Sequence, residues 1–86
     1  MEKLIGENDN YMFYNWVSAT ELARITRGNL KAYNWHVLTV YNKQKELQGV
    51  HLIDSDTNNF IHDFNSRNLE EVCCMIDAIK LKMMYE

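Results

Sequence analysis

The stretch YNWHVLTVYNKQKELQGVHLI, residues 33–53, decides the fold of this chain. β-Branched and aromatic residues dominate both of its ends, which favours two strands over residues 33–42 and 48–53. The polar run KQKEL between them predicts a hairpin connection. Residues 59–64 follow the turn-forming run DSDTN and predict a third strand. We therefore expect an antiparallel sheet at the centre of the molecule.

These strands are apolar on both faces. One face is expected to carry His36, Leu38, Val40, Val50, Leu52, Phe60 and Phe64. The other face is expected to carry Trp35, Val37, Tyr41, Ile53 and Ile61. A sheet with one face in water alternates apolar and polar residues instead. The second face therefore needs a cover, and in so short a chain we expect another molecule to supply it.

Helix signals stand on either side of the hairpin. Residues 11–17 (YMFYNWV) predict a strand, and Ser18 with Glu21 then forms a capping box that opens a helix over residues 19–27, closed by Gly28. Asn68 with Glu71 forms a second capping box, which opens a helix running to about residue 84. Residues 1–10 are polar enough to be loosely ordered. The element order β-α-β-β-β-α predicts an α+β fold with an antiparallel sheet of three to four strands and the C-terminal helix packed across one face.

The C-terminal helix has two apolar stripes. The core-facing stripe is expected to hold Leu69, Val72, Cys73, Ile76, Ile79 and Met83. Cys74, Ala78, Leu81 and Tyr85 recur at steps of four, three and four on the other side. This weaker stripe either arose by chance or marks a side of the helix that packs against a partner.

Composition limits the class of protein. The chain has 86 residues, of which 47% are hydrophobic, with no Pro and three Gly, so we expect one domain, residues 1–86, with a real core. A formal charge of −3 argues against a non-specific nucleic-acid binder. Cys73 and Cys74 are adjacent, which fits a reducing cytosol better than a disulfide scaffold. We expect neither an export signal nor a membrane span, and hence a cytoplasmic protein.

Two patterns suggest metal ligands. Asp54, Asp56 and Asn58 match the opening of a calcium loop, but Asn59 replaces its glycine and Asn65 its bidentate glutamate, so the pattern favours a hairpin turn. Three histidines on consecutive predicted strands, His36, His51 and His62, suggest a zinc site. If Leu38 pairs with Leu52, and Val50 with His62, then His36 and His62 share one face and His51 lies on the other. We therefore predict no metal and no cofactor.

The segment SATELARITRG resembles the opening of a helix-turn-helix motif, and Arg24, Arg27 and Lys31 could contact phosphates. The strand-like YNWHVLTVY that follows does not fit a recognition helix. A nucleic-acid-binding regulator that uses these cations and the sheet aromatics is therefore the alternative function.

The leading hypothesis is a non-catalytic protein-binding module, because no nucleotide-binding or hydrolase motif occurs. Its contact centre is predicted at Trp35, Val37, Tyr41, Ile53 and Ile61, with Leu81 and Tyr85 as a secondary contact. An acidic patch of Asp54, Asp56 and Asp63 would steer a basic partner. The partner is expected to be a protein or a second copy, as in a homodimer. The compact, Asn-rich chain is typical of a small inhibitor or regulator from a phage or mobile element.

Overall fold

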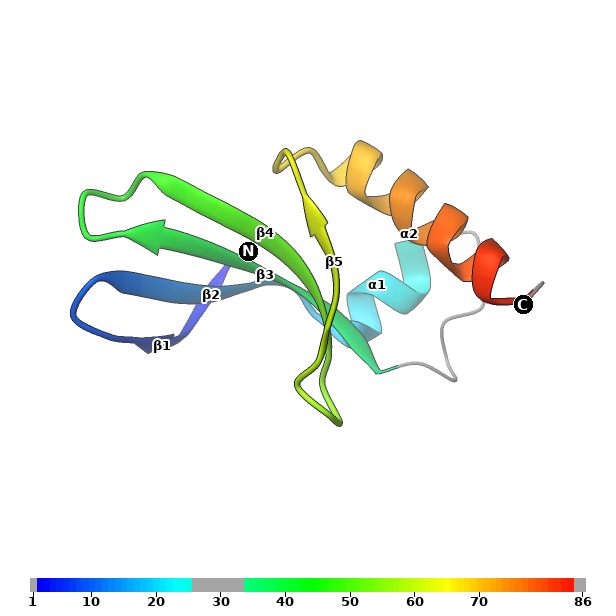
Figure 1. Cartoon of the computed structure of the whole chain (residues 1–86), viewed down its shortest axis with the longest axis horizontal. Coiled ribbons are helices and arrows are strands. Elements are labelled where there is room, and N and C mark those ends of the chain that lie inside the picture. The colour runs from blue at the N-terminus through cyan, green and yellow to red at the C-terminus, as the bar shows by residue number, and fades with distance from the viewer. Residues whose placement is uncertain (1, 26–33, 85–86) are drawn as a thin grey trace.

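The computed structural model describes residues 2–25 and 34–84 and has the predicted α+β fold. Its elements are β1 (Lys3–Glu7), β2 (Tyr11–Val17), α1 (Ala19–Ile25), β3 (Trp35–Asn42), β4 (Leu47–Asp54), β5 (Phe60–Phe64) and α2 (Leu69–Met84). The five strands form one antiparallel sheet whose order follows the chain. Figure 1 shows both helices at one end of this sheet, while the β1–β2 and β3–β4 hairpins extend away from them.

The first strand was not expected. Part of residues 1–10, predicted to be loosely ordered, forms β1 and pairs with β2 along its length. The Asn8 side-chain oxygen accepts hydrogen bonds from the backbone N–H groups of Asn10 and Tyr11, at 2.9 and 2.8 Å, and so fixes the connecting turn. All five residues of β1 are exposed. Backbone pairing and turn chemistry therefore form this strand without a buried face.

The β3–β4 register differs from the expected one by a single residue. Leu52 pairs with Val37 rather than with Leu38. Because side chains alternate along a strand, a one-residue shift moves a whole apolar set to the opposite face. Trp35 and Val37 therefore lie on the same face as Val50 and Leu52, so the predicted grouping of residues on the two faces is wrong.

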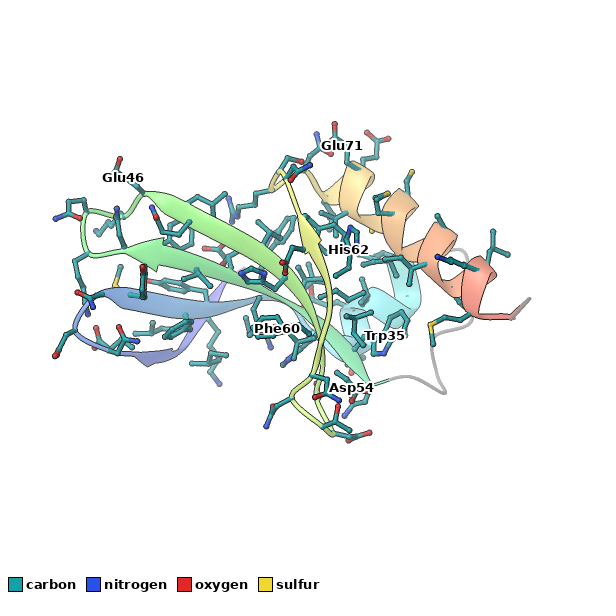
Figure 2. All side chains as sticks on the ribbon, viewed as in Figure 1. Trp35, Glu46, Asp54, Phe60, His62 and Glu71 are labelled. Atoms are coloured by element: carbon teal, nitrogen blue, oxygen red, sulfur yellow. The ribbon has the colours of Figure 1, made fainter. Side chains whose placement is uncertain are left out.

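The core lies between this face and the two helices. Its buried side chains are Val17, Leu22, Trp35, Val37, Val50, Leu52, Val72 and Ile76. Leu22 comes from α1, while Val72 and Ile76 come from α2. We call this side of the sheet the inner face and the opposite side the outer face. In Figure 2, Trp35 lies toward α1, and Phe60 lies on the other side of the β4 and β5 ribbons.

Each neighbouring pair of strands contains one irregularity in register, and each leaves one extra residue. The extra residues are Ile5, Trp16, Gln48 and Ile61. Trp16 and Ile61 both pack against the core, because a bulge turns two successive side chains toward the same side. Ile5 and Ile61 belong to the two edge strands, β1 and β5. A bulge on an edge strand disfavours pairing with a foreign strand.

Both helices begin at the predicted caps. The Ser18 hydroxyl accepts a hydrogen bond from the backbone N–H of Glu21 at 3.2 Å. The Asn68 side-chain oxygen does the same for Glu71 at 3.2 Å. In the second cap the Glu71 carboxylate accepts from the Ser66 hydroxyl at 2.7 Å, which ties the start of α2 to the loop after β5. The predicted end of the first helix, residues 26–28, lies outside the described residues.

The burial of Trp35 predicts a large effect on stability. Trp35→Ala removes a side chain that is 2% exposed and leaves a cavity, so we expect the free energy of unfolding to fall by about 3–5 kcal/mol. Phe60→Ala removes an aromatic ring that is 68% exposed, and we expect a change of about 0.5 kcal/mol or less. Urea denaturation measures both. Equal denaturation midpoints for the two variants would contradict the burial of Trp35.

Candidate functional site

An open groove with a volume of about 1100 Å³ runs along α2 and reaches the end of α1. Its apolar lining consists of Ile25, Leu69, Cys73, Cys74 and Leu81. Its polar lining consists of Arg67, Asn68, Glu70, Asp77 and Lys80. Ile25, Leu69 and Leu81 are 45%, 43% and 54% exposed. Large apolar side chains from both helices therefore meet solvent in one concave surface, which we call the α2 groove.

The rotation of α2 about its axis creates this surface. Val72 and Ile76 are 1% and 0% exposed and point into the core. With that side fixed, the predicted second stripe faces outward: Cys74, Ala78 and Leu81 are exposed. Its last member, Tyr85, lies outside the described residues. The core stripe is shorter than predicted, because Leu69 and Met83 at its two ends are 43% and 42% exposed.

A polar cluster holds the wall of the groove at the start of α2. The Arg67 guanidinium forms an ion pair with the Glu2 carboxylate at 2.6 Å, and it lies 5.3 Å from the centre of the Trp16 ring. Glu2 also accepts hydrogen bonds from the hydroxyls of Thr39 and Tyr41, at 3.2 and 3.1 Å. Residues that precede β1, lie on β3 and precede α2 thus meet at one carboxylate. Arg67 is thereby positioned before the first turn of α2.

Tyr41 was predicted as part of the contact centre and instead belongs to this cluster. It is half-buried, and its ring meets that of Tyr14 edge-on, with 5.4 Å between the centroids. Burial raises the pKa of Tyr41, and the hydrogen bond to the Glu2 carboxylate and its charge raise it further. Arg67 and Thr39 act in the opposite direction. The Tyr41 hydroxyl is therefore held in its protonated, donating form.

The two cysteines in the groove differ in exposure. Cys74 is exposed, whereas Cys73 is half-buried. Burial raises the pKa of the Cys73 thiol, and the charges of Asp77 and Cys74 raise it further. A thiol with a raised pKa holds less of the nucleophilic thiolate at neutral pH. Cys73 is therefore poorly suited to nucleophilic catalysis.

The rest of the predicted contact centre is not on the surface. Trp35 and Val37 are 2% and 0% exposed and belong to the core, because the observed register places them under the helices. Ile61 is half-buried and packs against the same core. Ile53 is 6% exposed but pairs with His36 on the outer face, outside the core cluster. The predicted contact centre is therefore not a surface of the folded chain.

The outer face has its own arrangement near β5. His51 Nδ1 lies 2.6 Å from a carboxylate oxygen of Asp63, and the His51 ring meets Phe60 edge-on with 5.3 Å between centroids. On β3, burial lowers the pKa of His36, while the charge of Asp54 raises it. Phe60 is the most exposed aromatic side chain here, at 68%. Leu38 and Val40 also lie on this face and are half-buried.

The carboxylates of the predicted acidic patch have local partners. Asp54 accepts hydrogen bonds from the backbone N–H groups of Asp56 and Thr57, at 2.9 and 3.4 Å, and Asn58 adopts a positive φ of 59°. These are features of a tight turn, as the sequence favoured over a calcium loop. Asp56 accepts from the Asn34 side-chain amide at 3.1 Å. With Asp63 held by His51, each of the three carboxylates has a local partner. Figure 2 shows Asp54 beside the β4–β5 turn, far from Glu71 at the start of α2.

The histidines are grouped differently from the prediction. His36 and His51 lie on the outer face, and His62, which pairs with Leu52, lies on the inner face. The one-residue shift in the β3–β4 register accounts for the difference. Within residues 2–25 and 34–84, no three histidine, cysteine or acidic side chains gather in a way that could hold a metal ion.

The cations of the nucleic-acid alternative are only partly described. Arg24 is exposed in the last turn of α1. Arg27 and Lys31 lie outside the described residues, so their position relative to the sheet aromatics is not part of this structure.

One groove residue was missed by the sequence analysis. Lys80 is only 7% exposed, although it was assigned to neither apolar stripe. It follows Val72 and Ile76 at intervals of four, which places it on the core-facing line of α2. That spacing could have identified it, but a charged side chain is usually expected to face solvent.

Comparison with known proteins gives no assignment: no family model, no curated protein and no solved structure matches this chain. In the part of the chain that the structure describes, neither helix has the length and apolar character needed to cross a membrane.

The polar cluster predicts how Tyr41 titrates. Because its folded-state pKa lies above the ordinary value of 10.0, its contribution to stability is complete below that pH and is lost as the pH rises through the folded-state pKa. Glu2→Gln removes the charge beside the hydroxyl, so we expect the Tyr41 pKa to fall toward 10.0. Titration of the tyrosine ring carbons by NMR measures it. Glu7→Gln, which removes the exposed partner of Lys43, is the control and should leave the Tyr41 pKa unchanged. If Tyr41 has the same pKa in the Glu2→Gln variant and in the unaltered chain, the polar cluster is contradicted.

The cysteines predict a difference in thiol reactivity. In single-thiol variants, Cys74→Ser leaves the half-buried Cys73, and Cys73→Ser leaves the exposed Cys74. We expect Cys73 to react more slowly with Ellman's reagent at neutral pH and to gain reactivity only in more alkaline solution, because its pKa is raised. Asp77→Asn should shift that gain to lower pH. A Cys73 that reacts as fast as Cys74 at neutral pH would rule out this environment.

Proposed function

We propose that this chain is a non-catalytic protein-binding module and that the α2 groove is its docking surface. The observation that carries the proposal is the convergence of Ile25, Leu69 and Leu81, each more than two-fifths exposed, in one concave surface. Exposed apolar patches of this kind mark sites of protein interaction. A partner that covers them would remove apolar area from water, which is the main driving force of association.

The shape of the molecule supports the groove over the sheet edges. Both edge strands carry a bulge, at Ile5 and Ile61, which disfavours strand addition. The groove instead presents a helix and a neighbouring helix end, a geometry that accepts an apolar segment of another protein. Such a module would act in the cytosol as an inhibitor, a regulator or an oligomerising accessory protein. Its partner would be a foreign protein or a second copy of this chain.

Leu81 provides the sharpest test. Leu81→Asp places a charge in the groove at a side chain that is 54% exposed, so we expect the fold to survive and the affinity for the partner to fall at least about tenfold. Leu47→Asp is the matched control, because Leu47 is 42% exposed at the start of β4 and does not line the groove. Circular dichroism and urea denaturation check that both variants are folded.

Two measurements give the readout. Sedimentation velocity of the unaltered chain and the two variants at high micromolar concentration tests self-association. Capture from a cell extract of the source organism, quantified by mass spectrometry, tests for a foreign partner. We expect the complex to persist with Leu47→Asp and to disappear with Leu81→Asp. If Leu81→Asp retains every interaction of the unaltered chain, the α2 groove is not the docking surface.

A further inference from the structure

Lys80 occupies a position that an apolar side chain would ordinarily fill. It lies four residues after Ile76 on the core-facing line of α2 and is 7% exposed. It also lines the α2 groove, next to Leu81. A lysine in such a place packs its aliphatic stem against the core and keeps its ammonium at the open side, which here is the groove.

The Lys80 ammonium has no partner among residues 2–25 and 34–84. The ion pairs in this part of the chain join Lys43 with Glu7, His51 with Asp63 and Arg67 with Glu2. No hydrogen bond involves the Lys80 side chain there either, although Asp77 and Glu70 also line the groove. The other basic group of the groove, Arg67, is already neutralised by Glu2. Of the two cations that line the groove in the described residues, Lys80 is therefore the one without a counter-charge there.

An ammonium without a partner in the described residues, set beside apolar side chains, favours a specific kind of occupant. The ammonium nitrogen keeps contact with solvent in the free chain. An apolar segment that covered the groove would take this charge out of water, which is unfavourable unless an anion on the segment pairs with it. A singly charged carboxylate fits better than a phosphate, because the Glu70 carboxylate on the same surface would repel a second negative charge. The apolar side chains that also line the groove, among them Leu81 and Ile25, favour apolar neighbours around that carboxylate.

We propose that the α2 groove binds an apolar segment of a partner protein whose single Asp or Glu pairs with Lys80. This inference rests on the proposed function. The apolar residues of that segment cover Ile25, Leu69 and Leu81. The carboxylate fixes the register of the segment along the groove, because only one position brings it to the ammonium. Apolar contact thus supplies affinity, and the ion pair supplies specificity.

A displayed library of random peptides provides the probe. Selection on the immobilised, unaltered chain should enrich peptides with one acidic residue between apolar residues. Enriched peptides are then measured by fluorescence anisotropy against Lys80→Met, which keeps the length of the side chain but removes the charge. We expect binding to weaken about ten- to a hundredfold, the range of a charge-assisted hydrogen bond. Lys82→Met, at an exposed position of α2 outside the groove, should leave the affinity unchanged.

A peptide variant completes a double-mutant cycle. Replacing the acidic residue of the peptide by its amide should weaken binding to the unaltered chain but have little further effect on Lys80→Met. If Lys80→Met binds the peptides as well as the unaltered chain while Leu81→Asp does not, the groove is a docking surface but the carboxylate assignment is wrong. If Leu81→Asp also binds normally, or no peptide is enriched, both the proposed function and this inference are wrong.

Discussion

The pairing of Val37 with Leu52 is the constraint on which the rest of the molecule depends. It brings Trp35 and Val37 to the same face as Val50 and Leu52, and so gathers the large strand side chains into one core. A core on one face needs a cover on that face alone, which two short helices can supply. The register therefore determines which face of the sheet the helices cover. Figure 1 shows both helices at one end of the sheet.

The placement of the helices in turn creates the candidate site. The caps at Ser18 and Asn68 fix where α1 and α2 begin, and the burial of Leu22 and Ile76 fixes how each is rotated. Once those side chains point inward, Leu81 has no place in the core and faces the groove. Exposed apolar side chains thus lie on α2, such as Leu81, as well as on the sheet, such as Phe60. The α2 groove therefore differs from the surface that the strand pattern indicated.

Local signals in the sequence predicted the elements better than their pairing. Both helix starts follow from side chains within three residues of each other, so the sequence contains the whole cause. The β3–β4 register does not follow in this way, because YNWHVLTVY has apolar residues in both of its alternating sets of positions and would bury apolar side chains in either register. The observed register buries the polar Thr39 on the inner face, where its hydroxyl donates a hydrogen bond to the Glu2 carboxylate. Glu2 is distant in the sequence, so the strand pattern does not reveal this partner. β1 was missed for the related reason that its all-exposed residues have no apolar pattern.

Lys80 and Arg67 show how two cations in one groove can have different roles. Arg67 is bound by Glu2, stacks on Trp16 and joins the loop before α2 to the start of β1, so its charge is used within the fold. Lys80 is more deeply buried, at 7% exposure, yet has no such partner in the described part of the chain. The aliphatic stem accounts for this burial, because the ammonium nitrogen keeps contact with solvent. The groove beside it is the surface from which a counter-charge can approach.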